Sequence, residues 1–251
     1  MYNKVRYYWR VFGTGIGFLI IGLGGVVVFP VLNLLIWPPA KRAIIARHLI
    51  KFSFRAVLIL MRLVGVLRYE ITGLKRLDRS GLLILANHPT LIDILFLIGF
   101  VKRAECIVKS GLWQNPFTHA TVRAAGYICN DDAAVVLEQG IAALHSGSNL
   151  IIFPEGTRTP ADGSIALRRG AANIAVRGRC NVTPVIIRCS PRMLTKKERW
   201  WQIPSQVVNF NIEVKEDILI QPIIAAAGNP AVAARRLTHY LEQYFVNYAI
   251  A

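Results

Sequence analysis

The chain has 251 residues, of which 54% are hydrophobic, and its 30 Lys and Arg against 14 Asp and Glu give a formal net charge of +16. This length suits one large domain that buries on the order of 70% of its unfolded surface and argues against a second full domain. The charge attracts anionic partners, but the scattered basic residues and the high hydrophobic fraction disfavour nucleic acid and favour membrane lipids.

The N-terminal region is predicted to enter a membrane. Residues 11–37 form a run of 27 residues without a charge, longer than the ~20 that cross the hydrocarbon core. A signal peptide has a much shorter apolar region. The glycines of this run and Pro30 are expected to kink or weaken the helix. Basic residues flank the run on both sides, which favours a segment that dips into one leaflet and returns, with a tilted span as the alternative.

Residues 40–67 are basic and amphipathic, which predicts a helix at an anionic interface, or a packed helix with one solvated face. We therefore divide the chain into a membrane-inserted and amphipathic helical region, 1–67, and an α/β domain, 68–251. The basic flanks predict that the protein lies on the cytoplasmic face of the inner (cell) membrane.

Strand-like and helix-like segments alternate after residue 67. This predicts an α/β fold with a mostly parallel central sheet flanked by helices. The predicted strands cover 68–72, 82–86, 106–108, 127–129, 150–153, 182–187 and 207–214, and the predicted helices cover 91–100, 115–125, 131–145, 169–177 and 230–248. The basic and aromatic stretch 196–201 fits either the lipid headgroup level or a loop packed on the domain. The four cysteines form no Cys-x-x-Cys pair, which predicts free thiols in a reducing compartment.

Two of the apolar strands end in polar turns. The run 82–86 leads into Asn87 and His88, and Pro89 keeps His88 out of helical geometry. Asp93 follows five residues later, and a carboxylate on one ring nitrogen orients an imidazole as a general base. The run 149–153 leads into Pro154-Glu155-Gly156-Thr157-Arg158-Thr159. Because ligands gather beyond the carboxyl ends of strands in such sheets, both turns are expected to share one cleft.

These two turns carry a resemblance to a known family. Asn87 to Asp93 resembles the His-x4-Asp motif of the 1-acylglycerol-3-phosphate (lysophospholipid) acyltransferase family, and Phe153 to Thr159 resembles its Glu-Gly-Thr-Arg motif. The likeness extends over about residues 71–188 and includes segments at Val108-Lys109-Ser110 and 182–185.

The resemblance implies a membrane-associated O-acyltransferase that moves a fatty acyl group from an acyl thioester to the hydroxyl of a lysophospholipid-like acceptor. His88 would be the general base and Asp93 would orient it, without a covalent intermediate, a cofactor or a metal. Acyl-CoA or an acidic acyl carrier protein would be the donor, and the oligomeric state stays open. The acceptor would be bound by Glu155, Gly156, Thr157 and Arg158, with Asn87, Lys109, Arg168 and Arg169 as further candidate substrate contacts.

One position departs from the family pattern. The family commonly has Gly-x-x-Phe-x-x-Arg between the two main motifs, and Asp132 stands here at the Arg position. Either the acceptor has a different headgroup, such as that of a lyso-aminolipid, or Asp131 and Asp132 cap the following helix while Arg158 and Arg168 bind phosphate. Two further interpretations compete with an enzyme: a non-catalytic lipid-binding protein of the same fold, and a basic nucleic-acid or protein-binding module.

Overall fold

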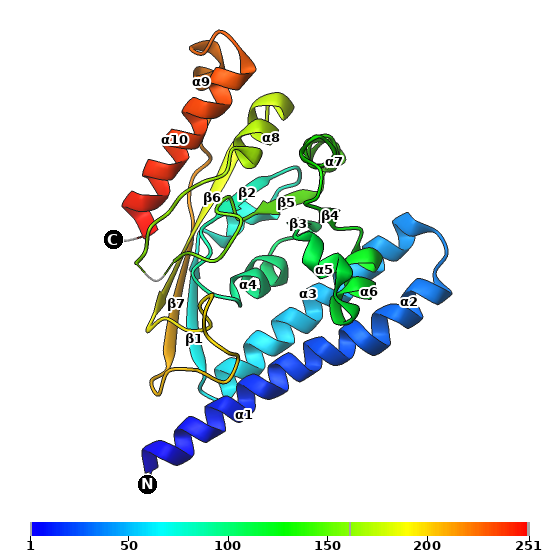
Figure 1. Cartoon of the computed structure of the whole chain (residues 1–251), viewed down its shortest axis with the longest axis vertical. Coiled ribbons are helices and arrows are strands. Elements are labelled where there is room, and N and C mark those ends of the chain that lie inside the picture. Colours follow the sequence, from blue (N-terminus) through cyan, green and yellow to red (C-terminus); the bar gives the residue numbers. More distant parts are fainter. Residues whose placement is uncertain (1, 161, 250–251) are drawn as a thin grey trace.

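A seven-stranded sheet forms the centre of the computed structural model, which describes residues 2–160 and 162–249 (Figure 1). The strand order is β1-β7-β6-β2-β5-β3-β4, and neighbouring strands are parallel except for the antiparallel pair β6 and β7. The predicted α/β fold with a mostly parallel sheet is therefore confirmed. The strands are β1 (Leu67–Thr72), β2 (Leu83–Ala86), β3 (Ala104–Val108), β4 (Ile128–Cys129), β5 (Asn149–Ile152), β6 (Val182–Ser190) and β7 (Val208–Val214).

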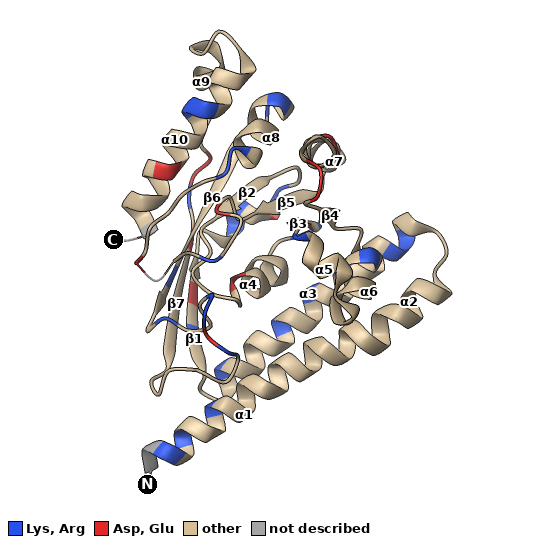
Figure 2. Cartoon of the chain, in the orientation of Figure 1, with Lys and Arg blue, Asp and Glu red and all other residues tan. Residues whose placement is uncertain are grey.

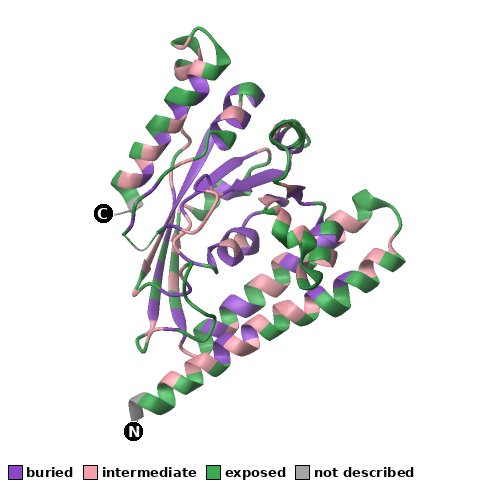
Figure 3. Ribbon diagram, in the orientation of Figure 1, coloured by how far each residue is buried: buried purple, intermediate pink, exposed green. Residues whose placement is uncertain are grey.

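Helices cover both faces of the sheet because the central strands are apolar on both sides. All four residues of β2 and of β5 are buried (Figure 3). Leu83 and Leu85 join the core on one face, and Ile84 and Ala86 join the core on the other. The first of these faces packs against α7 (Ala133–His145), α8 (Gly170–Gly178), α9 (Gln221–Ala225) and α10 (Pro230–Ala249), and the second against α3 (Pro39–Leu63), α4 (Asp93–Phe100), α5 (Ser110–Gln114) and α6 (Pro116–Ala125).

The N-terminal region is a long helical hairpin (Figure 1). Helix α1 (Tyr2–Leu23), a π-helical turn (Gly24–Val28) and α2 (Phe29–Leu35) continue into one another, and α3 returns beside them. The Phe29 N–H bonds back to the Gly24 carbonyl, five residues earlier. Such a widened turn makes room for the ring of Pro30, which would collide with the carbonyl four residues before it in a regular helix. The apolar run thus stays helical through Pro30, and the chain turns back at the end of the run, between α2 and α3. The dip into one leaflet and the tilted span both stay predictions.

The glycines of α1 serve packing. A Cβ atom at Gly13 would lie 2.5 Å from Val64 Cγ2, and one at Gly17 would lie 3.1 Å from Val57 Cγ1. Two glycines four residues apart lie on one face of a helix and let a second helix approach closely. These two glycines therefore form the contact with the end of α3, and the expectation that the glycines of this run weaken the helix stays a prediction.

The hairpin shares its core with the α/β domain. Ala46 and Ile50 of α3 are buried in the same cluster as Phe96 of α4 and Phe210 of β7. The predicted boundary at 67/68 falls one residue into β1, and the packing is continuous across it. The first arm of the hairpin, Lys4–Leu35, is long and apolar enough to cross a membrane by length and composition. Only 11% of its most apolar 18-residue stretch is buried.

Candidate active site

Asn87 fastens the end of β2 to the neighbouring strand β6. Its side-chain amide donates to the Ile187 carbonyl at 2.8 Å and accepts from the Ile187 N–H at 2.7 Å. Both polar atoms are thereby engaged and the residue is buried. The Asn87 side chain therefore holds the turn after β2 against β6, and its expected contact with substrate stays a prediction.

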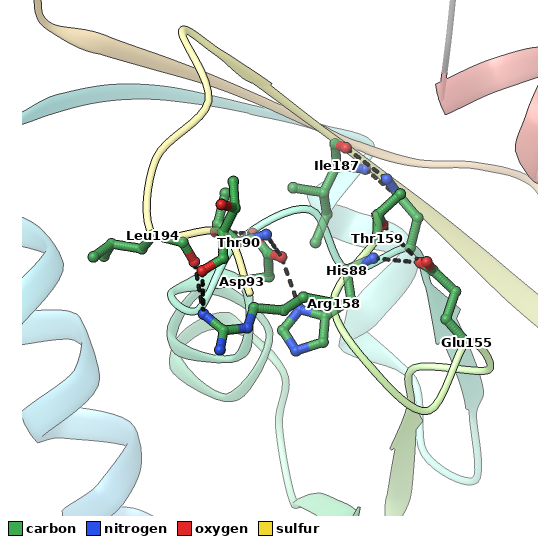
Figure 4. A network of polar contacts seen from close by, with 10 residues as sticks. His88, Thr90, Asp93, Glu155, Arg158, Thr159, Ile187 and Leu194 are labelled. Atoms are coloured by element: carbon green, nitrogen blue, oxygen red, sulfur yellow. Dashed lines mark hydrogen bonds and ion pairs between the residues drawn. The ribbon is translucent and has the colours of Figure 1, made fainter. Parts of the chain in front are cut away.

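His88 and Asp93 form a hydrogen-bonded dyad beyond β2 (Figure 4). His88 Nδ1 lies 2.9 Å from Asp93 Oδ2, the same oxygen that accepts the Thr90 N–H at 2.7 Å, and the Thr90 hydroxyl donates to Asp93 Oδ1. Asp93 is fully buried at the start of α4. Burial raises its pKa, and the hydrogen bonds from His88 and Thr90 oppose that rise. A carboxylate held in this way fixes the imidazole tautomer.

The imidazole is fixed from a second side by Phe153, the residue that follows β5. The two rings stack with their centroids 4.0 Å apart and an angle of 19° between their planes. Among the described residues Nε2 has no hydrogen-bond partner, and 17% of the His88 side chain is exposed. The ring therefore presents one free nitrogen at the carboxyl ends of β2 and β5.

Glu155 and Thr159 join the turn after β5 to the turn after β2. Glu155 Oε1 accepts the His88 N–H at 2.9 Å and the Thr159 hydroxyl at 2.9 Å, and the Thr159 N–H donates to the His88 carbonyl at 2.7 Å. Burial raises the pKa of Glu155. Its second oxygen is buried without a hydrogen-bond partner among the described residues. The expected shared site is thus present, and Glu155 ties its two halves together.

Arg158 and Gly156 have partners of their own in this turn. Arg158 Nη1 donates to the carbonyls of Leu194 at 2.8 Å and Thr195 at 2.9 Å, in the connection between β6 and β7. One nitrogen of the Arg158 guanidinium, which is expected to bind phosphate, therefore binds the protein backbone instead. Gly156 has a φ of 67°, and a Cβ there would lie 2.8 Å from Arg168 Nε. Only glycine combines this backbone conformation with so close a side chain.

The other predicted substrate contacts differ in how far their side chains are exposed. Lys109 is exposed immediately after β3, and Arg168 and Arg169 are exposed before α8. Thr157 is half-buried beside Gly156. Asp132 caps α7 by accepting the backbone N–H groups of Ala134 at 2.7 Å and Val135 at 3.3 Å. The helix-capping role expected of Asp132 is the one that the structure shows.

A cysteine nucleophile fits this site poorly. All four cysteines are free. Burial raises the pKa of the Cys189 thiol, on β6, to about 12, and the negative charge of Asp93 raises this pKa as well. Such a thiol stays protonated near neutral pH and is a weak nucleophile. The residues that sequence reasoning missed are Thr90 and Phe153, both inside the two motifs, whose contacts depend on the folded turns.

Comparisons with known proteins find similarity to acyltransferases. Residues 68–188 match the family model described as Acyltransferase. The 1-acyl-sn-glycerol-3-phosphate acyltransferase of Pseudomonas aeruginosa is 26% identical over 204 residues, which cover 79% of this chain and 75% of that protein. The Saccharomyces cerevisiae protein of the same name is 25% identical over 55% of this chain and 48% of its own length.

A solved structure also shares the fold. The crystal structure of the 1-acyl-sn-glycerophosphate acyltransferase from Thermotoga maritima has a TM-score of 0.71 to this chain at 19% identity, and the match covers 97% of both chains. This likeness shows that the two chains share the fold, from the N-terminal helical region to the mostly parallel sheet. Residues 68–188 therefore form a domain of the acyltransferase family.

Proposed function

We propose that this protein transfers a fatty acyl group from an acyl thioester to the free hydroxyl of a membrane lysophospholipid, with His88 as the general base. The observation that carries the proposal is the His88 imidazole itself. Its Nδ1 lies 2.9 Å from the buried Asp93 carboxylate, and its Nε2 is without a partner among the described residues. A carboxylate in this place stabilises the imidazolium that forms during proton transfer.

The reaction then follows from one nitrogen acting twice. His88 Nε2 takes the proton of the acceptor hydroxyl while the oxygen attacks the thioester carbonyl carbon. The tetrahedral intermediate collapses, the carbon–sulfur bond breaks, and the thiolate takes the proton from the imidazolium. The products are the acylated lipid and a free thiol, and the protein ends unchanged. A positioned base contributes about 10²–10⁴-fold to the rate of such a step.

We propose a phosphate-bearing acceptor, the lysophosphatidate class that the names of the relatives indicate. Exposed Lys109, Arg168 and Arg169 supply cationic groups around the carboxyl edge of the sheet. The Asp132 carboxylate, which would repel a phosphate, accepts two backbone N–H groups at the start of α7. A residue engaged as a cap gives little reason to expect a cationic headgroup.

We propose the acyl donor and the location of the protein from its positive charge and its apolar N-terminal stretch. Acyl-CoA and acyl carrier protein are both anionic, and the chain has an excess of basic residues. The long apolar stretch Lys4–Leu35 would hold the protein in the membrane. The first acidic residue of the chain is Glu70, and such unbroken positive charge favours the cytoplasmic face of the inner membrane.

The test of the catalytic proposal is thioester consumption by purified protein in detergent, with thiol release as the readout. His88→Ala should remove transfer and keep the melting temperature, because the ring contributes more to chemistry than to packing. His239→Ala, which removes an exposed imidazole on α10, is the matched control. Near-normal transfer by folded His88→Ala would reject the general base. Absence of transfer by the unmodified protein with every acceptor would favour a lipid-binding protein without turnover.

The test of the acceptor is a comparison of lyso-lipids with one thioester donor. We expect lysophosphatidate to react faster than zwitterionic or amino-acid-headed lyso-lipids. Asp132→Arg should keep this order and lower stability by about 1 kcal/mol through the lost cap, whereas Asp132→Asn should keep both. If the unmodified protein prefers an amine-bearing acceptor and Asp132→Arg reverses the preference, a lyso-aminolipid replaces lysophosphatidate as the acceptor.

A further inference from the structure

The connection from β6 to β7 exposes two tryptophans side by side. We call residues 196–201, Lys196-Lys197-Glu198-Arg199-Trp200-Trp201, the Trp corner. All six residues are exposed, and Trp200 and Trp201 keep 45% and 42% of their surface open to solvent. The indoles contact each other edge to face, with centroids 5.4 Å apart. A pair of large apolar rings on a surface marks an interaction site more often than a single exposed ring does.

Hydrogen bonds to backbone N–H groups and buried flanking residues fix the conformation of the Trp corner. The Thr195 N–H donates to a Glu198 carboxylate oxygen at 2.7 Å, and the Arg199 N–H donates to Gln202 Oε1 at 2.8 Å. Leu194 and Ile203, on either side of the corner, are buried. The tryptophans are therefore presented by two bonded turns on an anchored base.

The same connection packs on the N-terminal helix α1. A Cβ at Gly15 would lie 3.1 Å from Trp200 Cζ3, so the indole lies directly on that helix. The Tyr7 hydroxyl donates to the Trp201 carbonyl at 3.3 Å, and the Arg10 guanidinium donates to the Ser205 carbonyl. The same helix also carries exposed aromatic residues, Tyr8, Trp9 and Phe12, close to Tyr7 and Arg10 in the sequence. The corner and its connection thus pack on the first half of α1, which itself carries exposed aromatic residues.

Charge at this end of the molecule is strongly positive. The connection 191–207 holds Arg192, Lys196, Lys197 and Arg199 against the single acidic residue Glu198. Lys4, Arg6 and Arg10 begin α1, and no acidic residue marks the N-terminal hairpin (Figure 2). The Arg199 guanidinium lies 5.3 Å from the centre of the Trp201 ring. Tryptophan with lysine and arginine is the composition that settles at the headgroup level of anionic membranes.

We propose that the Trp corner docks on an anionic phospholipid surface, with both indoles at the headgroup level and Lys196, Lys197 and Arg199 on lipid phosphates. The inference rests on the proposed membrane association and adds a contact made by the α/β domain itself. An inserted N-terminal helix by itself leaves the whole molecule able to turn about the axis of that helix relative to the membrane. A second contact removes this freedom, and Arg158 connects it to the active site through the Leu194 and Thr195 carbonyls.

The depth of the indoles tests the proposal. One variant keeps Trp200 and Trp201 through Trp9→Phe, Trp37→Phe and Trp113→Phe, and a second keeps Trp9 alone. Each full chain is reconstituted in phosphatidylcholine vesicles with and without phosphatidylglycerol, using lipids brominated at different depths. We expect quenching of Trp200 and Trp201 to be strongest with bromines near the headgroup and at least twofold stronger with phosphatidylglycerol. Both chains should melt like the unmodified protein.

The two variants separate this proposal from the membrane association beneath it. Quenching of Trp9 without quenching of Trp200 and Trp201 would overturn the docking of the Trp corner and leave insertion of α1 intact. Absence of quenching in both would overturn both. This readout does not depend on acyl transfer, so an inactive preparation does not change the conclusion.

Charge reversal provides an independent arm. In the chain that keeps Trp200 and Trp201, the triple change Lys196→Glu, Lys197→Glu and Arg199→Glu should lower headgroup quenching at least twofold. The same change of charge at Arg177, Arg179 and Arg235, exposed on the α8 and α10 side, should leave it unchanged. If the corner triple leaves quenching unchanged and instead lowers activity selectively with acyl carrier protein, the surface binds an acidic protein and the proposal is wrong.

Discussion

Asp93 has both carboxylate oxygens engaged, and this arrangement depends on Thr90. The two residues lie three positions apart, and both the N–H and the hydroxyl of Thr90 donate to the carboxylate. Since burial raises the pKa of Asp93, each donor helps to keep the carboxylate ionised. In the proposed reaction Thr90 would act through Asp93, as a positioning residue.

Thr90→Val should lower kcat about tenfold with little change in KM, because the missing hydroxyl leaves one Asp93 oxygen without its donor. The loss of a hydrogen bond to the charged form raises the pKa of Asp93 further. The acidic limb of the kcat profile should therefore move to higher pH. Thr90→Ser restores the donor and should restore both values. A Thr90→Val enzyme with an unchanged pH profile would remove Thr90 from the catalytic geometry.

Glu155 gives a test in which stability, rather than rate, depends on pH. Burial raises its native pKa above the ordinary value of 4.5. The native state then holds its proton more tightly, so the stability contributed by this group is complete below pH 4.5 and is lost as pH rises through the raised native pKa. Glu155→Gln keeps an acceptor for the His88 N–H and removes the titration.

We therefore expect the melting temperature of Glu155→Gln, relative to the unmodified protein, to rise with pH across that window. Glu155→Ala should instead be destabilised by about 1–3 kcal/mol at every pH, because it leaves the His88 N–H without its acceptor. Thermal melts in one nonionic detergent between pH 4 and pH 8 make the comparison. A constant difference between Glu155→Gln and the unmodified protein would mean that Glu155 does not titrate in this range.

At the scale of elements, Arg158 joins the turn after β5 to the connection between β6 and β7. One guanidinium nitrogen holds two carbonyls there, which leaves the remaining donors for a ligand. Arg158→Lys keeps the charge and one donor to these carbonyls but loses the planar fork.

Arg158→Lys should therefore keep its melting temperature within a few degrees and raise KM for the acceptor more than KM for the thioester donor. Initial rates with each substrate varied in turn provide the measurement, and limited proteolysis within 191–207 reports whether the connection loosens. A selective rise in KM for the donor would assign Arg158 to the thioester pocket instead.

The helices and strands also show which features of the fold and the site can be predicted from the sequence and which cannot. Short apolar runs predict β2 and β5, and the His88 to Asp93 spacing predicts the dyad, because these features are local. The partners of Asn87 and Arg158 lie 100 and 36 residues away in the chain. No local pattern specifies them. The insertion of β7 between β1 and β6 is likewise a matter of long-range pairing, and the short helices α5 and α9 lack a periodic pattern long enough to read.

At the scale of the whole molecule, the helix from residue 2 to residue 35 is longer than a membrane is thick. At 1.5 Å per residue it measures about 50 Å, against a hydrocarbon core of about 30 Å. Its outward side is largely exposed in the structure (Figure 3). A helix of this length would tilt in a bilayer that it crossed, or would leave the bilayer at one end.

The protein should therefore pellet with membranes and remain there after a wash in about 1 M salt, where charges are screened beyond about 3 Å. Apolar insertion is not weakened by such a wash. Removal of residues 1–37 should increase the fraction released, and an immunoblot of pellet and supernatant measures it. Complete release of the full-length protein by salt alone would leave only electrostatic attachment.

The pairing of β1 with β7 also determines when the molecule can be finished. Leu67 pairs with Val208, 141 residues later in the chain, and among the described residues β1 has no other strand beside it in the sheet. A ribosome adds about 5–20 residues per second, so the first strand waits roughly 7–28 s for its partner. The N-terminal hairpin emerges before this wait begins. Lodging it in a bilayer would tether the nascent chain while the sheet, and with it the catalytic edge, is completed at the membrane surface.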